Sequence, residues 1–251
     1  MKKKCRRKLS AAQKKRKMQR NIRMGMLLLL LILVVLGVGK LAKKIWFSDQ
    51  YQERSGDAVD AVRPDIDVEL LTVNPYSRPG TKVNKITGIV VHYTANPGAT
   101  AMDNRNYFEG LKDSHTTSVS SNFIVGLEGE IIQCVPTWEV AYASNSRNMD
   151  TVSIECCHPD ETGKFNEKTY ESMVDLCAWL CLKFDLDETY QSSIELVAWL
   201  MGRYDLTTDD VIRHYDVTGK NCPKYFVEDE EAWKTFKEKI GARLEEYRRK
   251  M

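Results

Sequence analysis

Two histidines and one cysteine in this chain have the types and spacing of metal ligands. His92 ends an apolar, β-branched run, and His214 and Cys222 lie eight positions apart, joined by a loop that contains a glycine. Imidazole nitrogens and a thiolate are good ligands for Zn²⁺, and three protein ligands with a fourth position left open are typical of catalytic rather than structural zinc sites. The pattern therefore predicts a zinc site at His92, His214 and Cys222, and hydrolysis as the reaction. The alternative is a set of ordinary, partly buried side chains.

The segments around these ligands resemble the zinc-binding segments of N-acetylmuramoyl-L-alanine amidases, a superfamily that includes phage T7 lysozyme and the animal peptidoglycan recognition proteins. The resemblance spans about Lys85 to Phe226 and is carried by motifs in the family's order: Val91-His92-Tyr93-Thr94, Ser121 to Gly126, Gly129-Glu130-Ile131, Thr151 to Glu155, and His214 to Pro223. It implies an α/β fold with a mixed central sheet flanked by helices. It also implies zinc-dependent hydrolysis of the amide between N-acetylmuramic acid and L-alanine in peptidoglycan.

The same resemblance implies catalytic roles for Glu155 and Lys220. A glutamate at the matching position acts as general base in one branch, where a carboxylate can take a proton from the attacking water and pass it to the departing amine. Lys220 precedes Cys222 by two residues, as in the family's Lys-x-Cys-Pro pattern. Its fixed positive charge is expected to stabilise the oxyanion that develops during the reaction. The alternatives are a strand-end glutamate paired with a surface lysine and a solvated loop lysine.

The sequence departs from the family at two places. Where some members carry a tyrosine or histidine in the middle strand, this chain has Ser121-Asn122-Phe123. Asn122 is expected to hydrogen-bond substrate, but an amide cannot act as acid or base near neutral pH. Where many members have a Trp-His pair that lines the cleft, this chain has Val140 to Ser144. His115 and His158 are expected to be solvated, with reach into the cleft as the alternative.

These departures leave two other functions open. One is a peptidoglycan-binding sensor on the same fold without hydrolysis, although non-catalytic recognition proteins lose the cysteine ligand and this chain keeps Cys222. The other is a zinc hydrolase of a different acylated amino sugar or peptide. The resemblance favours the amidase over both.

Apolar periodicity predicts the elements that position these residues. Strands are expected at 86–92, 122–125, 131–135 and 151–157, and helices at 167–184, 188–204 and 228–249, with Thr207 capping a short turn before Val211. Strands interleaved with helices predict a three-layer α/β domain with a mixed central sheet, the fold that the resemblance also implies.

Charge is segregated along the chain. Residues 1–24 hold twelve Lys or Arg and no Asp or Glu, whereas from residue 45 onward 22 basic residues stand against 35 acidic ones. An acidic body argues against a nucleic-acid partner.

Residues 24–39 are uncharged, and Arg23 and Lys40 can snorkel to extend this run towards the roughly 20 residues that a membrane-spanning helix needs. The alternative is a buried core helix behind a basic, nucleic-acid-binding tail.

The predicted organisation follows from the positive-inside rule. Residues 1–23 form a basic cytoplasmic tail, 24–44 a transmembrane signal anchor, 45–80 an extracytoplasmic stalk or extension, and 81–251 the zinc amidase domain with its C-terminal helix. The protein is thus expected in the cell membrane, single-pass, as a monomer whose catalytic domain faces the cell wall and whose partner is peptidoglycan.

Seven cysteines raise the question of disulfides in an exported domain. Cys5 falls on the predicted cytoplasmic side and Cys222 is assigned to the metal. The other five are Cys134, Cys156, Cys157, Cys177 and Cys181. Because free cysteine often behaves as a small buried hydrophobe, mostly buried thiols with at most one or two bridges are expected.

Overall fold

The computed structural model describes residues 57–83, 85–184 and 207–250, and within them a six-stranded sheet has the order β1-β4-β3-β5-β2-β6. The strands are β1 (Asp67–Val68), β2 (Gly88–Tyr93), β3 (Phe123–Val125), β4 (Ile131–Gln133), β5 (Thr151–Cys156) and β6 (Val211–Arg213). The β3–β4 pair is antiparallel and the other four pairs are parallel. The predicted α/β class with a mixed central sheet is confirmed.

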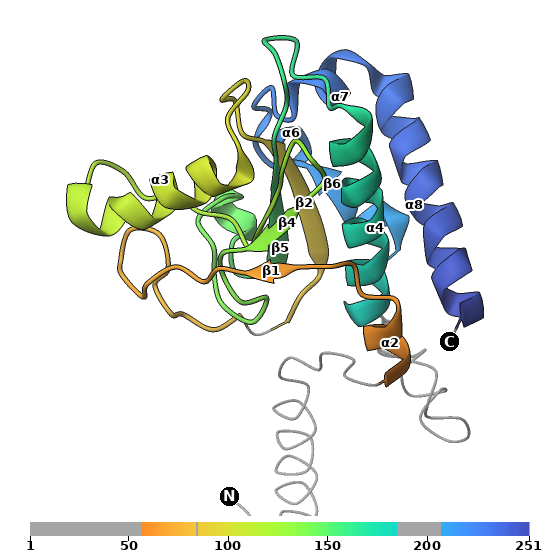
Figure 1. The fold of residues 1–251 in the computed structure, drawn as a ribbon, viewed down its shortest axis with the longest axis horizontal. Helices are drawn as coiled ribbons and strands as arrows, with labels where there is room; N and C mark the ends of the chain where they lie inside the picture. Colours follow the sequence, from red (N-terminus) through yellow and green to blue (C-terminus); the bar gives the residue numbers. More distant parts are fainter. Residues whose placement is uncertain (1–56, 84, 185–206, 251) are drawn as a thin grey trace, which may run out of the picture. The chain divides into compact units, whose positions relative to one another are not determined.

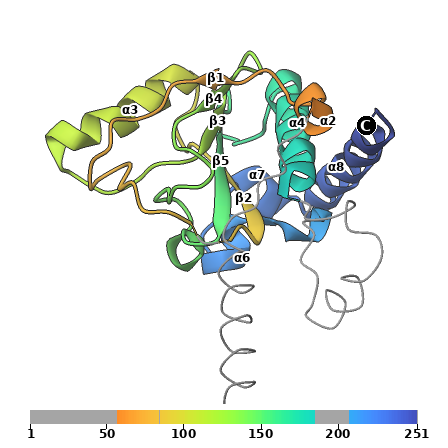
Figure 2. The same ribbon diagram turned by 90° about the horizontal axis from the view of Figure 1, so that it is seen from below.

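Helices cover both faces of this sheet (Figures 1 and 2). On one side lies α3 (Ala101–Ser114), and on the other lie α4 (Glu167–Phe184) and α8 (Glu230–Lys250), which pack against each other. The shorter elements are α2 (Asp57–Ala61), α6 (His214–Thr218), α7 (Lys224–Glu228) and the 3₁₀ turns η1 (Asn145–Arg147) and η2 (Thr208–Asp210). This is the predicted three-layer arrangement, with a hydrophobic cluster on each face of the sheet.

The central strands are apolar because they are covered on both faces, as in parallel sheets generally. Ile89 and Val91 of β2 join the core formed with α4 and α8. Successive side chains of a strand alternate between faces, so His92 projects on the opposite face, towards α3. The same alternation places Ile154 of β5 in the α4–α8 core and Glu155 on the α3 face. Two predicted site residues therefore share one face of the sheet.

The helical predictions are confirmed where the apolar stripe is broad. The observed bounds of α4 are those predicted, and most of its side chains are buried. The predicted helix at 228–249 is observed as α8, which begins two residues later, at Glu230, because Asp229 leaves helical geometry and its carboxylate accepts the N–H of Ala232 in the first turn of α8. Thr207 caps η2 through a capping box, as expected.

The predicted boundary at residue 80 differs from the structure, because the chain from residue 57 onward is built into the domain. The indole N–H of Trp179 in α4 donates to the carbonyl of Val59 in α2 at 3.2 Å, and β1 pairs in parallel with β4. Leu71 is 1% exposed, and Arg78 makes a bidentate ion pair with Glu139. A two-residue strand carries too little alternation to be recognised in a sequence.

Several predictions fall outside the described residues: the basic tail, the anchor at 24–44, the helix at 188–204 and Cys5. Among the residues that are described, no helix combines the length and the hydropathy that crossing a membrane requires. The six cysteines in the described ranges are all buried and none forms a disulfide, which agrees with the prediction of buried thiols.

Candidate active site

The candidate site lies where three parallel strands end. His92 and Glu155 are register partners near the carboxyl ends of β2 and β5, and β6 ends at Arg213, directly before His214. Open α/β sheets bind ligands at the carboxyl ends of their strands. Glu155 lies 63 positions after His92 and 59 positions before His214, and the sheet brings all three predicted site residues to one edge.

Cys222 reaches the same place from the loop between α6 and α7. The short helix α6 is followed by Gly219, whose φ of 76° lets the chain turn back in a conformation that favours glycine. The returning loop is held by a hydrogen bond from the backbone N–H of Tyr215 to the carbonyl of Cys222, at 2.9 Å. The fold brings the predicted cysteine next to both predicted histidines.

His92, His214 and Cys222 form one buried group whose ligand atoms all lie within 4.8 Å of one another. The Sγ of Cys222 is 3.8 Å from Nδ1 of His92, and the two imidazole centroids are 4.6 Å apart. Ligand atoms of a tetrahedral zinc site, about 2.0–2.3 Å from the metal, are separated by roughly 3.3–3.6 Å. Neither buried ring nitrogen of His214 has a hydrogen-bond partner among the described residues. The residues therefore fit a Zn²⁺ ion.

The electrostatics of the group favour the ligand form of both histidines. Burial, followed by the charges of His214 and Lys220, holds the pKa of His92 well below its ordinary value. Burial and Lys220 also lower the pKa of His214. Burial and the neighbouring Glu155 raise the pKa of Cys222 to about 12, although the backbone N–H of Tyr93 and the Lys220 charge oppose this. A bound divalent cation reverses that balance, because a coordinating thiol loses its proton.

Glu155 is partly buried beside the ligand group, with a side chain that is 14% exposed and one oxygen without a hydrogen-bond partner among the described residues. Its Oε1 lies 3.9 Å from Nδ1 of His92, and its Oε2 has no hydrogen-bond partner in the described part of the chain. Burial raises the pKa of Glu155 to about 8, against the opposing charge of Lys220. A carboxyl group with a pKa near the working pH is suited to exchange protons.

Residues 82–191 match the N-acetylmuramoyl-L-alanine amidase family. The N-acetylmuramoyl-L-alanine amidase CwlL of Bacillus licheniformis is 38% identical over 184 residues, which cover 68% of this chain and 45% of that protein. The amidase BlyA of Bacillus subtilis (strain 168) is 31% identical over 194 residues, covering 69% of this chain and 46% of BlyA. This chain belongs to the N-acetylmuramoyl-L-alanine amidase family. It spans about half the length of these curated relatives.

The fold of this family member is also found in a solved structure. The structure of PlyL aligns with a TM-score of 0.50 at 23% identity, and the alignment covers 70% of this chain and 97% of PlyL. The fold implied by the sequence resemblance is thereby confirmed.

A cleft of about 240 Å³ opens over the ligand group. One wall is formed by Asn104, Tyr107 and Phe108 of α3, and Tyr107 is 54% exposed. Glu155 and Lys220 line the cleft together with the three candidate ligands. The α3 wall was not predicted, because nothing in the spacing of these residues distinguishes a cleft-facing from a solvent-facing helix position.

The structure does not place Asn122 in this cleft. Its side chain is 1% exposed, and its Nδ2 donates to carbonyls of the segment 135–139, including Pro136 at 3.1 Å and Glu139 at 3.3 Å. Its Oδ1 accepts from the N–H and the hydroxyl of Ser153. This prediction of a substrate contact is wrong for the described geometry, because the amide's hydrogen-bonding capacity is used to join β5 to the loop after β4.

The two other histidines do not line the cleft. His115 is exposed at the end of α3 and stacks on Tyr76 with ring centroids 4.4 Å apart. His158 is 1% exposed rather than solvated, and its ring lies against Tyr93 with centroids 5.1 Å apart. Its Nδ1 is 2.7 Å from the carbonyl of Asp160. His158 therefore packs behind Tyr93, next to the site.

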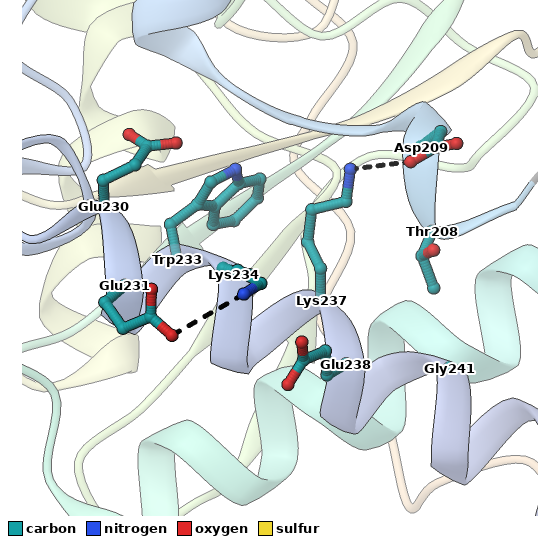
Figure 3. A pocket seen from close by; sticks show the side chains of 9 residues that line it. All are labelled: Thr208, Asp209, Glu230, Glu231, Trp233, Lys234, Lys237, Glu238 and Gly241. Carbon is teal, nitrogen blue, oxygen red and sulfur yellow. Dashed lines mark hydrogen bonds and ion pairs between the residues drawn. The ribbon is translucent and has the colours of Figure 1, made fainter.

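A larger groove, of about 500 Å³, lies between η2 and α8 and contains none of the predicted site residues. Figure 3 shows its lysines engaged with neighbouring carboxylates: Lys237 with Asp209 at 3.0 Å and Lys234 with Glu231 at 3.8 Å. Size alone favours this groove. The smaller cleft is nevertheless the better candidate for the reaction site, because it contains side chains whose pKa values are shifted by burial and a set of converging candidate ligands.

Proposed function

We propose that this chain is a zinc-dependent N-acetylmuramoyl-L-alanine amidase that hydrolyses the amide between N-acetylmuramic acid and L-alanine in peptidoglycan. The observation that carries the proposal is the buried group of His92, His214 and Cys222, with the carboxyl of Glu155 beside it and a cleft above it. The names of the relatives supply the substrate class.

His92, His214 and Cys222 would hold the metal. Glu155 would transfer protons, and Lys220 would stabilise negative charge. When bound, the metal supplies Lewis-acid polarisation of the scissile carbonyl and lowers the pKa of water at the site. Glu155 takes a proton from the attacking water and delivers it to the amine nitrogen of L-alanine as the C–N bond breaks. The Lys220 ammonium, on the cleft wall, stabilises the negative charge that develops on the carbonyl oxygen.

The test uses the purified full-length chain with zinc and isolated peptidoglycan. Release of stem peptides with a free N-terminal L-alanine, measured by mass spectrometry, is expected for the wild type and is lost in Cys222→Ser and Glu155→Ala. Binding to peptidoglycan without release would replace the proposal with the sensor. Release of a different product would replace it with a hydrolase of another acylated amino sugar or peptide.

We also propose that a monomer of this chain is held in the cell membrane by residues 24–44, with the basic tail in the cytoplasm and the amidase domain outside. The support is the charge segregation of the sequence and the positive-inside rule. A tag placed after the last residue should be accessible to antibody on intact spheroplasts. A tag that is reached only after the spheroplasts are lysed would overturn the topology.

A further inference from the structure

The two ring nitrogens of His92 face different partners. Nδ1 is directed at the candidate metal position, 3.8 Å from Sγ of Cys222 and 3.9 Å from Oε1 of Glu155. Nε2 lies 3.1 Å from the hydroxyl oxygen of Ser144. Both side chains are almost fully buried, His92 at 2% and Ser144 at 1% exposure, so bulk water does not compete for this contact.

The Ser144 hydroxyl does not make the capping hydrogen bond that is usual for a serine at this position. Ser144 is the residue before η1, where a serine side chain usually accepts a backbone N–H of the first turn. Within the described structure it makes no such capping bond. The hydroxyl is thus available to bond with His92, and η1 lacks a side-chain cap from Ser144.

The backbone around Ser144 is held by another side chain. The Oδ1 of Asn148 accepts the N–H groups of both Ala143, at 3.1 Å, and Ser144, at 2.5 Å. The carbonyl of Ser144 accepts the N–H of Arg147 at 3.0 Å. These bonds fix the serine main chain, so that the hydroxyl meets His92 from a defined direction.

We infer that Ser144 is a positioning residue that holds His92 in the tautomer protonated on Nε2. A hydroxyl oxygen that accepts the Nε2 proton leaves the lone pair on Nδ1, the nitrogen that faces Cys222 and Glu155. Partners of this kind fix the ring orientation of metal-binding histidines. His214 has no equivalent partner among the described residues, so His92 is the histidine whose direction the protein sets in advance.

The first test needs no metal and no activity. The full-length chain is labelled with ¹⁵N-histidine, stripped of metal, and the tautomer of His92 is read from long-range ¹⁵N–¹H correlations. The wild type is expected to show the proton on Nε2, and Ser144→Ala to show a shift towards Nδ1. Ser120→Ala is the matched control, because its equally buried hydroxyl accepts the N–H of Tyr142 at 3.0 Å, and it should leave His92 unchanged. A wild-type His92 protonated on Nδ1 overturns the inference, even if Ser144→Ala fails to fold.

The second test measures zinc dissociation constants by competition with a chelator, and it rests on the proposed zinc site. Ser144→Ala is expected to bind zinc about 10–100-fold more weakly than the wild type, and Ser120→Ala to bind like the wild type. Ser144→Thr keeps the hydroxyl and should restore most of the affinity. Unchanged affinity in Ser144→Ala overturns the positioning role. If the tautomer and zinc results hold but no stem peptide is released, the amidase proposal fails and the role of Ser144 stands.

Discussion

Glu155 and His92 are paired directly in the parallel register of β5 and β2, and Oε1 of Glu155 lies 3.9 Å from Nδ1 of His92. Backbone hydrogen bonds of the central sheet therefore fix the distance between the proposed general base and a proposed metal ligand. Sites built on strands are held more precisely than sites on loops. By contrast, Lys220 and Cys222 come from the loop after α6, whose turn depends on Gly219.

Replacing Glu155 with Gln removes proton transfer while keeping the shape of the side chain. The expected result is a fall in kcat for stem-peptide release of about 10²–10⁴-fold, the usual contribution of a positioned acid or base. Zinc content should stay stoichiometric, because Glu155 is outside the ligand group. Glu128→Gln is the control, since that carboxylate is exposed and pairs only with Lys168 in the described structure. A Glu155→Gln variant with wild-type kcat would exclude this base.

The same carboxyl predicts a pH-dependent stability in the metal-free protein. Burial raises the pKa of Glu155 from 4.5 to about 8, so between these pH values the folded chain keeps a proton that the unfolded chain has lost. The contribution of Glu155 to the free energy of unfolding therefore decreases as pH rises through this window and levels off above it. Glu155→Gln abolishes the effect. Urea unfolding at both ends of the window should show the variant gaining stability over the wild type near pH 8 and not near pH 4.5. A pH-independent difference would contradict the shifted pKa.

Lys220 is predicted to act on the transition state rather than on substrate binding. Lys220→Met should lower kcat by about 10²–10³-fold, the loss typical of one oxyanion-stabilising group, and leave KM nearly unchanged. Lys224→Met is the control, because the Lys224 ammonium donates to the carbonyl of Glu161 at 2.9 Å and does not line the cleft. Steady-state kinetics on soluble peptidoglycan fragments separate the two constants. A rise in KM alone would assign Lys220 to binding.

The grouping of the three candidate ligands and the main elements could be predicted because their signals are local. His92, His214 and Cys222 lie in short motifs, and α4 has an apolar stripe long enough to define both ends. The Ser144–His92 contact joins residues that lie 52 positions apart, and the Ser144 side chain does not make the capping bond expected from its local position. No sequence pattern therefore predicts this contact.

Asn122 shows the other limit of sequence reasoning. It directly precedes β3, where a shift of one residue changes the face on which a side chain lies. Its burial further depends on carbonyls of the segment 135–139, which the fold alone brings near. The motif indicated a position beside the middle strand, but the direction of this side chain could not be read from it.

Zinc uptake is predicted to release protons. Burial and Glu155 raise the pKa of Cys222 to about 12, so the metal-free thiol is protonated at neutral pH and must ionise to become a ligand. The imidazoles need not lose protons, because the pKa values of His92 and His214 are lowered. At least one proton should leave per zinc, and apparent affinity should rise about tenfold per pH unit for each proton released. Calorimetry in two buffers of different ionisation enthalpy counts these protons.

The control for this count is a second buried thiol. Burial also raises the pKa of Cys134 to about 12, but Cys134 belongs to the cluster that packs against α3 and is outside the ligand group. Cys134→Ala should therefore release as many protons as the wild type. Zinc binding without proton release would mean that Cys222 is not a ligand.

Asn122 is predicted to stabilise the fold rather than to bind substrate. Asn122→Ala removes the acceptor of the buried Ser153 N–H and one donor to the carbonyls of Pro136 and Glu139, of which Pro136 still accepts the N–H of Glu139. Each buried group that loses its partner costs about 1–3 kcal/mol, so the free energy of unfolding should fall by at least that amount. The folded variant should keep its KM for peptidoglycan fragments, because the amide does not line the cleft. Asn106→Ala, at an exposed position of α3, is the control and should change neither quantity. A raised KM with unchanged stability would instead restore the substrate contact that the sequence suggested.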